Sequence, residues 1–302
     1  MILITGGLGF IGTHTARALV ELGHPVVLAQ RRQATAPLEA VTERVDLTDL
    51  DALRGVGDRH EITGIVHLAG SMPWPPSDDE PIEAARRALG SLFNVLQAAQ
   101  DWGVKRVGIA STIGVYGGVD SDTPFTEDMP LPMTSGHLIP AFKKIGELLT
   151  DHLAGATGMD VVNYRIGAIW GPLGHTSERF FAAPKLIHAA NSGEPATARA
   201  DDALDLCYVK DCGRGIALLQ TADTLAHRTY NVSSGRSTSN AEVVAAVRKI
   251  VPDARIDLTA DGTAMPHLDI TRLREDTGYE PAYDTERAVA DYLSWLRAGN
   301  PA

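Results

Sequence analysis

Four glycines near the start of the chain stand where a backbone can hold a phosphate group. The run Gly6-Gly7-Leu8-Gly9-Phe10-Ile11-Gly12 fits both Gly-x-x-Gly-x-x-Gly and Gly-x-Gly-x-x-Gly. Glycines there allow a tight turn and let the main chain approach a pyrophosphate, whose charge then lies at a helix N-terminus. A strand-to-helix turn can use glycines for geometry alone, but the position after a short apolar run favours dinucleotide binding. We therefore expect a dinucleotide to contact Gly6, Gly9, Phe10, Ile11 and Gly12.

The residues about 20 positions further on decide which dinucleotide is preferred. An acidic residue there would bind the ribose hydroxyls of NAD and repel the extra phosphate of NADP. This chain has Gln30, followed by Arg31 and Arg32, and guanidinium groups bind phosphate through charge-assisted hydrogen bonds. We predict that NADP is preferred over NAD, with two solvated surface arginines as the alternative. Asp46 and Leu47 are expected at the adenine, although Asp46 would equally suit the cap of the helix that follows.

These residues sit within an alternation of short apolar runs and longer stretches with helical spacing. The alternation is typical of βαβ units and a parallel sheet. Strands are predicted at residues 1–5, 25–30, 44–46, 64–68, 106–110 and 161–164, and long helices at 80–102 and 139–153. The sequence thus predicts an α/β fold, a Rossmann-type doubly wound parallel sheet over residues 1–170. A smaller substrate-binding lobe is expected over residues 171–302, with the chain crossing back to the sheet.

Composition and charge narrow the class of partner. Of 302 residues, 44% are hydrophobic and 22% are charged, which is typical of a packed globular protein. The formal net charge of −11 disfavours nucleic acid and anionic membrane surfaces as partners. We expect neither a signal peptide nor a membrane span, and Cys207 and Cys212 suit neither a disulfide framework nor a metal site. These features predict a cytoplasmic protein that binds a small molecule and no metal.

Further motifs, taken in order, resemble one known family. They include Val66-His67-Leu68-Ala69-Gly70, the run Ser111-Thr112-Ile113-Gly114-Val115-Tyr116-Gly117, and residues 90–96, 165–172, 208–211, 230–235 and 277–281. Together with the glycine run they make the chain similar to the extended short-chain dehydrogenase/reductases, the NAD(P)-dependent epimerase/dehydratase group. The resemblance covers nearly the whole sequence, and the order and spacing of the motifs make it specific.

The resemblance implies roles for particular residues. Leu68, Ala69 and Gly70 would line the cofactor beside the nicotinamide ribose. Thr112 would hold the substrate oxygen, and Lys143 would hold the ribose. The family's proton-transferring tyrosine, four residues before that lysine, is replaced by Ile139, which cannot transfer a proton.

The absence of the tyrosine phenol leaves three explanations. His137, two residues before Ile139, is the nearest candidate, because an imidazole has a pKa near neutrality. A surface or helix-capping role is its alternative. In the second explanation the reaction needs no proton at that point, or water serves. In the third reading the protein is a dinucleotide-binding sensor or scaffold without turnover.

Two other departures bear on the substrate. Nucleotide-sugar members of the family have an arginine for the substrate phosphates where this chain has Leu204, and often an asparagine where it has Ala168. An apolar residue there would leave buried phosphate charge uncompensated. We therefore predict an NAD(P)-dependent oxidoreductase of a small alcohol or carbonyl compound. The alternative is a nucleotide-sugar epimerase or dehydratase with tightly bound NAD.

The walls of the substrate pocket and the assembly of the chain are also predicted. Met72, Trp74, Trp170 and His175 fall on predicted loops and, with Ile139, are expected to line the pocket; core packing is their alternative. Family members commonly pair through two long helices, so a homodimer through residues 80–102 and 139–153 is expected.

Overall fold

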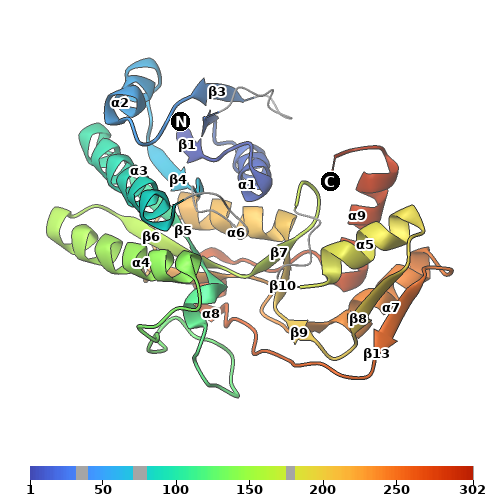
Figure 1. The fold of residues 1–302 in the computed structure, drawn as a ribbon. Helices are drawn as coiled ribbons and strands as arrows, with labels where there is room; N and C mark the ends of the chain where they lie inside the picture. The colour runs from blue at the N-terminus through green and yellow to red at the C-terminus, as the bar shows by residue number, and fades with distance from the viewer. Residues whose placement is uncertain (32–39, 71–79, 175–180, 302) are drawn as a thin grey trace.

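The computed structural model describes residues 1–31, 40–70, 80–174 and 181–301 and is built on a seven-stranded parallel sheet (Figure 1). The strand order is β11-β6-β5-β4-β1-β2-β3. The strands are β1 (Ile2–Thr5), β2 (Val26–Gln30), β3 (Val41–Arg44), β4 (Gly64–His67), β5 (Arg106–Thr112), β6 (Val161–Ile166) and β11 (Thr229–Val232). The chain moves outward from β1 to β3 and then returns to start β4 beside β1. The carboxyl ends of β1 and β4 therefore mark the switch point where open α/β sheets bind ligands, and the predicted fold class is confirmed.

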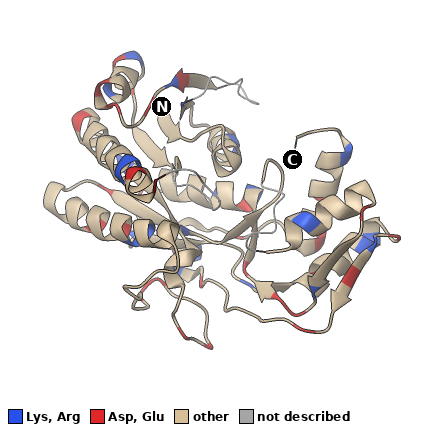
Figure 2. Ribbon diagram, in the orientation of Figure 1, with Lys and Arg blue, Asp and Glu red and all other residues tan. Residues whose placement is uncertain are grey.

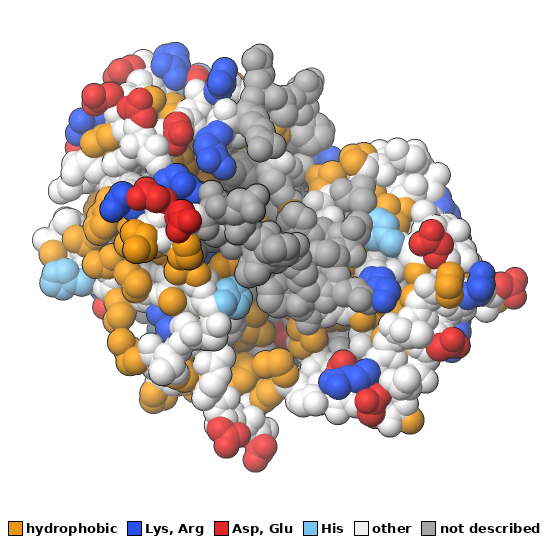
Figure 3. Space-filling model, viewed as in Figure 1, with side chains coloured by type: hydrophobic (Ala, Val, Ile, Leu, Met, Phe, Trp, Pro, Cys, Tyr) orange, Lys and Arg blue, Asp and Glu red, His pale blue; other side chains and the backbone are white. Residues whose placement is uncertain are grey.

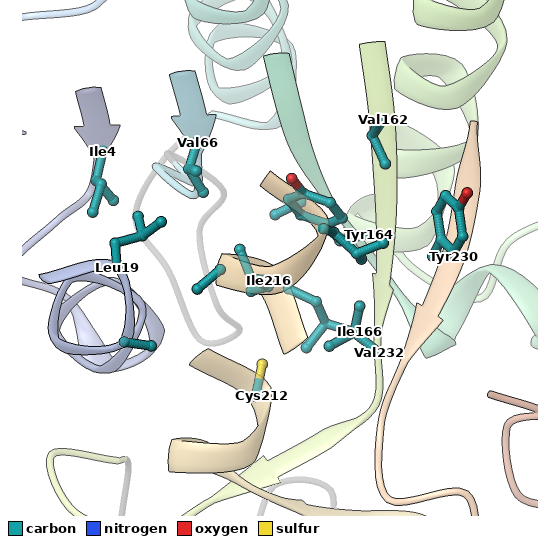
Figure 4. Packing of buried hydrophobic residues seen from close by; sticks show 14 of the residues in the cluster. Ile4, Leu19, Val66, Val162, Tyr164, Ile166, Cys212, Ile216, Tyr230 and Val232 are labelled. Atoms are coloured by element: carbon teal, nitrogen blue, oxygen red, sulfur yellow. The ribbon is translucent and has the colours of Figure 1, made fainter. Parts of the chain in front are cut away.

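Helices cover both faces of this sheet, which is why its strands read as continuous apolar runs. Helices α1 (Phe10–Glu21) and α6 (Val209–Thr221) pack on one face, and α2 (Leu50–Arg59), α3 (Pro81–Trp102) and α4 (Leu138–Thr157) pack on the other (Figure 1). Successive side chains of a strand point to opposite faces. Ile4 accordingly joins Leu19 and Ile216 in one buried cluster, shown in Figure 4, whereas Leu3 joins Leu53 in the other.

A smaller body lies to one side of the sheet (Figure 1). Helices α5 (Ala183–Ser192), α7 (Asn240–Ile250) and α9 (Thr285–Arg297) enclose a separate hydrophobic cluster with β7 (Ala168–Trp170) and β10 (Leu206–Tyr208). Two short ladders join it, β8 (Ala196–Arg199) with β13 (Ile256–Thr259) and β9 (Ala203–Leu204) with β12 (Thr238–Ser239). Helix α7 begins with a capping box, in which Ser239 and Glu242 satisfy each other's backbone N–H groups.

The structure differs from the sequence-based expectation at three strands. The third strand spans Val41–Arg44 rather than residues 44–46, because this exposed edge strand carries little apolar signal. Residues 168–170, expected in a loop, form β7. Strand β11, from the C-terminal part of the chain, pairs with β6 as the seventh strand of the sheet. With α6 packed on α1, the chain thus crosses back to the sheet after β7.

Positively and negatively charged residues are mixed on the outer surface. Lysine, arginine and acidic side chains are interspersed along the outer helices (Figure 2). Within the described ranges, every helix is too short or too polar to cross a lipid bilayer. Cys207 and Cys212 are both free and buried.

Candidate dinucleotide and substrate site

The glycine run forms a tight turn between β1 and α1. Gly6 has φ of +70°, a conformation that favours glycine, and its N–H donates to the carbonyl oxygen of Ala29 at 2.9 Å. A Cβ atom on Gly12 would lie 2.2 Å from the carbonyl oxygen of Gly6, so a side chain at that position would force the turn open. The close approach of the two glycines explains why the motif needs both of them.

The same turn presents the N-terminus of α1. Gly9 is the N-cap, and no side chain among the described residues caps the helix. The N–H of Thr13 bonds to Gly9, which leaves the earlier N–H groups, those of Phe10, Ile11 and Gly12, without partners in the helix. Free N–H groups and the helix dipole favour an anion at this end. The residues present therefore fit the pyrophosphate of a dinucleotide.

The adenosine end of the site lies where β2 and β3 finish side by side. Gln30 pairs in register with Arg44, and the Nε atom of Arg44 donates to the carbonyl oxygen of Arg31 at 3.3 Å. Arg31 and Arg44 are exposed, and Arg32 lies outside the described residues. Sequence reasoning missed Arg44, because only the register of the edge strand brings it beside Gln30.

Asp46 and Leu47 follow β3 at the same edge. Hydrogen bonds from the backbone and side chain of Thr48 lower the pKa of Asp46. The alternative role of Asp46 as a helix cap is wrong, because α2 begins at Leu50 and its cap is Asp49, which accepts from the N–H of Ala52. Leu47 is buried, and its carbonyl oxygen accepts from the side-chain amide of Asn94 at 2.8 Å.

A buried hydrogen-bond chain connects the ends of β1 and β4. The hydroxyl of Thr5 lies 2.7 Å from Nδ1 of His67 and accepts from the N–H of Ala69 at 3.2 Å. Burial, with the nearby Lys143 charge, lowers the pKa of His67 to about 3, so its imidazole is neutral. The backbone of Ala69 lies so close to Gly6 that a Cβ on that glycine would be 3.1 Å away. The backbone of Leu68 and Ala69 thus lies against the glycine turn, and their contact with a cofactor stays a prediction, as does that of Gly70.

A pocket opens beside this chain, between the ends of β4 and β5 and helices α3 and α4. Its polar lining consists of His67, Ser111, Lys143, Glu147 and Asn163, and its apolar lining includes Ala69, Ala88, Leu92, Ile109 and Phe142. The Nζ atom of Lys143 donates to the carbonyl oxygen of Ala110 at 2.6 Å. Burial lowers the pKa of Lys143 to about 8, while the carboxylate of Glu147 partly opposes that change. The lysine ammonium is therefore held beside β5 with a proton that it can release near neutrality.

Thr112 lies at the end of β5, and His137 and Ile139 lie at the start of α4. Thr112 ends β5, and its Oγ1 accepts from the N–H of Gly114 at 3.1 Å, which starts the short helix η1 (Ile113–Tyr116). His137 is the exposed N-cap of α4, and its Nδ1 accepts from the N–H of Ile139 at 3.2 Å. Ile139 is half-buried in the first turn of α4. The capping role weighed for His137 is thus realised in the structure.

Sequence reasoning missed a buried polar network behind the pocket. Both carboxylate oxygens of Glu147 accept from Arg165, with Nη2 to Oε2 at 2.7 Å, and Ser111 donates to the same carboxylate. Arg165 also donates to the hydroxyl of Tyr116 at 2.9 Å. Ion pairing with Glu147 raises the pKa of Arg165 against the opposing effect of burial. An arginine inside the largely apolar strand of residues 161–166 was the available signal, because a buried charge needs a partner.

Of the remaining predicted pocket residues, the structure describes Trp170. Trp170 is buried in β7 rather than on a loop, with its ring edge-on to Tyr208 at 5.4 Å and to Tyr292 at 6.5 Å. Core packing accounts for that position. Met72, Trp74 and His175 lie outside the described residues. Leu204 in β9 and Ala168 in β7 both pack with the hydrophobic cluster of the smaller body.

Metal chemistry receives no support from the described part of the chain, in which no three His, Cys, Asp or Glu side chains gather as a metal-binding group. The groups that converge at the sheet edge are instead free backbone N–H donors, a threonine, a histidine and a lysine. Such a set can hold a phosphorylated dinucleotide and polarise an oxygen atom beside it.

Comparisons with known proteins agree with this arrangement. A UDP-glucose 4-epimerase of Azospirillum brasilense is 27% identical over 98% of this chain and 92% of its own length. A solved L-threonine dehydrogenase from Cupriavidus necator, in its holo form, is 28% identical, with a TM-score of 0.80 over 98% of this chain and 99% of that one. A solved UDP-glucose 4-epimerase from Thermus thermophilus, in complex with NAD, shares the fold at 24% identity, with a TM-score of 0.80 over 98% of both chains.

A model of the NAD dependent epimerase/dehydratase family matches residues 2–233. This match spans the glycine turn, the histidine and lysine of the pocket and the seventh strand of the sheet, and it confirms the resemblance on which the site was predicted. The chain belongs to the NAD dependent epimerase/dehydratase family.

Proposed function

We propose that this protein is an NAD(P)-dependent oxidoreductase that interconverts a small alcohol and the corresponding carbonyl compound. The observation that carries the proposal is the apolar packing of Leu204 and Ala168 against the cluster of the smaller body. Neither side chain can compensate a buried diphosphate, whose charge is costly to bury without partners. A substrate without that diphosphate meets no such cost. Similarity to a dehydrogenase named for a small hydroxy amino acid supports the same substrate class.

Each group of the site has its own role in this reaction. A bound nicotinamide dinucleotide supplies or accepts the hydride, and the protein holds it and orients the substrate. The glycine turn and the N–H groups of Phe10, Ile11 and Gly12 would hold the pyrophosphate. The Oγ1 atom of Thr112 already accepts from Gly114, so its hydroxyl hydrogen is free to point toward a substrate oxygen. Lys143, beside the end of β5, would hold the nicotinamide ribose.

We further propose a preference for NADP over NAD. Gln30 brings no negative charge to the end of β2, and Arg31 and Arg44 lie exposed beside it. Two guanidinium groups at one strand end suit a 2′-phosphate, which an acidic residue would repel. The solved relative in complex with NAD shows that NAD is used within this fold.

A nucleotide-sugar epimerase is the second candidate, because the curated relatives at this similarity include UDP-glucose 4-epimerases. The two functions are separated by turnover with added substrate. The proposed function predicts consumption of NADPH by small ketones or aldehydes and no interconversion of UDP-hexoses. UDP-hexose interconversion without added cofactor would support the epimerase, and silence toward both substrate classes with a bound dinucleotide would support a sensor.

We also propose that the protein forms a homodimer through α3 and α4. Ile82 and Phe93 on α3 and Ile145 and Leu148 on α4 are exposed, with Leu148 at 64%. Figure 3 shows hydrophobic side chains gathered over these two helices. Contiguous exposed apolar surface of this kind marks an interaction site, and two antiparallel helices from each copy would bury it in a four-helix bundle.

A further inference from the structure

The proton that accompanies hydride transfer needs a source, because Ile139 stands where the family has its phenol. Three polar side chains of the pocket are already committed. Glu147 accepts from Arg165 and Ser111, which ties up both the carboxylate and the serine hydroxyl. The side-chain oxygen of Asn163 accepts from Thr150 at 3.1 Å, and a carboxamide has no proton to exchange near neutrality.

His67 does not serve either. Its Nδ1 lies 2.7 Å from the hydroxyl of Thr5, which also accepts from the N–H of Ala69. A neutral imidazole either donates to that hydroxyl or accepts from it, depending on its tautomer. Burial holds the pKa of His67 at about 3, so the ring does not gain a second proton at physiological pH.

Lys143 is placed to act where the phenol is missing. It lies one helical turn after Ile139 on the same face of α4, and helical side chains lean toward the N-terminus of their helix. The lysine thus extends toward the first turn. Its Nζ atom is bonded to Ala110, and Thr112 lies two residues further along β5, a step of about 7 Å toward the carboxyl edge of the sheet.

We propose that Lys143 itself exchanges a proton with the substrate oxygen, taking over the step that the family assigns to its tyrosine. This inference rests on the proposed function. In the reducing direction, the carbonyl carbon gains a hydride from the reduced dinucleotide and the carbonyl oxygen takes one proton from the Lys143 ammonium. The alcohol and the neutral amine result, and the amine regains a proton from water. Oxidation runs the same exchange in reverse, with the neutral amine accepting the hydroxyl proton.

The surroundings of Lys143 match this role. Burial lowers its pKa to about 8, and Glu147, one turn further along α4, acts in the opposite direction. From β4 it faces the neutral His67. The carboxylate of Glu147 is itself paired with Arg165 of β6. The lining residues from α3, Ala88 and Leu92, are apolar. Reduction should therefore slow as pH rises through about 8, whereas oxidation should speed up over the same range.

The first test measures the lysine without any turnover. Protein labelled with 13C at lysine Cε is titrated by NMR, and the Lys143 resonance is assigned by its absence in the Lys143→Arg variant. We expect a midpoint near pH 8 for Lys143. A midpoint near 10.5, the ordinary value for lysine, would overturn the inference.

The second test uses variants of the full-length enzyme. Lys143→Arg keeps a cation for the ribose but does not release its proton in this range, so at saturating NADPH it should reduce carbonyls at least 100-fold more slowly. Lys144→Arg, the neighbouring lysine whose Nζ donates to the carbonyl oxygen of Thr134 at 2.8 Å, is the matched control and should keep the full rate. Retention of the wild-type rate and pH profile by Lys143→Arg would contradict the inference.

The remaining candidate for the proton donor is His137, and the variant His137→Asn tests it. Asparagine keeps an N-cap for α4 but cannot titrate. The pH limb near 8 should persist in this variant, and its loss there, together with its persistence in Lys143→Arg, would assign the proton to His137 instead. Failure of the proposed function has a different signature, because wild-type protein would then bind the dinucleotide and reduce no carbonyl, whatever the midpoint of Lys143.

Discussion

The guanidinium of Arg165 donates to both carboxylate oxygens of Glu147, and both side chains are buried. Removing the charge from one member of such a pair leaves the other without compensation, at a cost of about 3 kcal/mol or more. Glu147→Gln should lower the free energy of unfolding by about that amount, as measured by urea denaturation at pH 7. Asp101→Asn, which breaks the exposed pair with Arg54, is the control and should have a far smaller effect. Equal losses of unfolding free energy in the two variants would show that burial does not make the Glu147–Arg165 pair more important for stability.

The glycine turn offers a second test. Gly12→Ala places a Cβ atom 2.2 Å from the carbonyl oxygen of Gly6, which should open the turn and weaken dinucleotide binding at least tenfold in calorimetric titration. Gly155→Ala makes the same change inside α4, where nothing lies within 4 Å of the added atom. This variant should bind the dinucleotide as the wild type does. Unchanged affinity in Gly12→Ala would mean that the turn does not hold the cofactor.

Cofactor preference depends on the end of β2 and its neighbour β3. Arg44→Ala should weaken NADPH binding by about tenfold, the loss of one charge-assisted contact, and should leave NADH binding nearly unchanged. Gln30→Asp should reverse the preference by repelling the 2′-phosphate. Both are measured as dissociation constants for the two reduced dinucleotides. Equal affinities in the wild type would rule out the proposed preference.

The exposed apolar face of α3 and α4 predicts an assembly. Leu148→Asp puts a charge at the centre of that face and should convert a dimer into a monomer in light scattering at micromolar concentration. Leu22→Asp changes an exposed leucine at the end of α1, away from this face, and should remain dimeric. A monomeric wild type would refute the assembly through these helices.

The central sheet could be predicted from the sequence because its strands are buried on both faces. Continuous apolar runs such as residues 2–5 and 64–67 have one structural interpretation when helical stretches separate them. The exposed edge strand Val41–Arg44 lacks that signal, and the prediction was displaced there. Strand β11 joins the sheet only through pairing with β6, a contact between segments that are far apart in the chain. Local patterns do not encode such a pairing.

The candidate site also combines features that local sequence predicts with features that depend on contacts between distant segments. The glycine turn is local, so its geometry follows from spacing alone. The position of Arg44 beside Gln30 depends on strand register, and the lowered pKa of Lys143 depends on the residues that bury it. The sequence therefore indicates candidate residues for the site, whereas packing determines which of them share a pocket and when they hold a proton.

The central claim is net transfer of hydrogen between a dinucleotide and a small substrate, and an isotope experiment tests it most directly. NADPH with deuterium at both hydrogen positions of nicotinamide C4 is supplied with small ketones and aldehydes, and the products are analysed by mass spectrometry. The alcohol product should carry the deuterium at its carbinol carbon. Unlabelled or absent alcohol, together with interconversion of UDP-hexoses by enzyme that retains its own NAD, would contradict it.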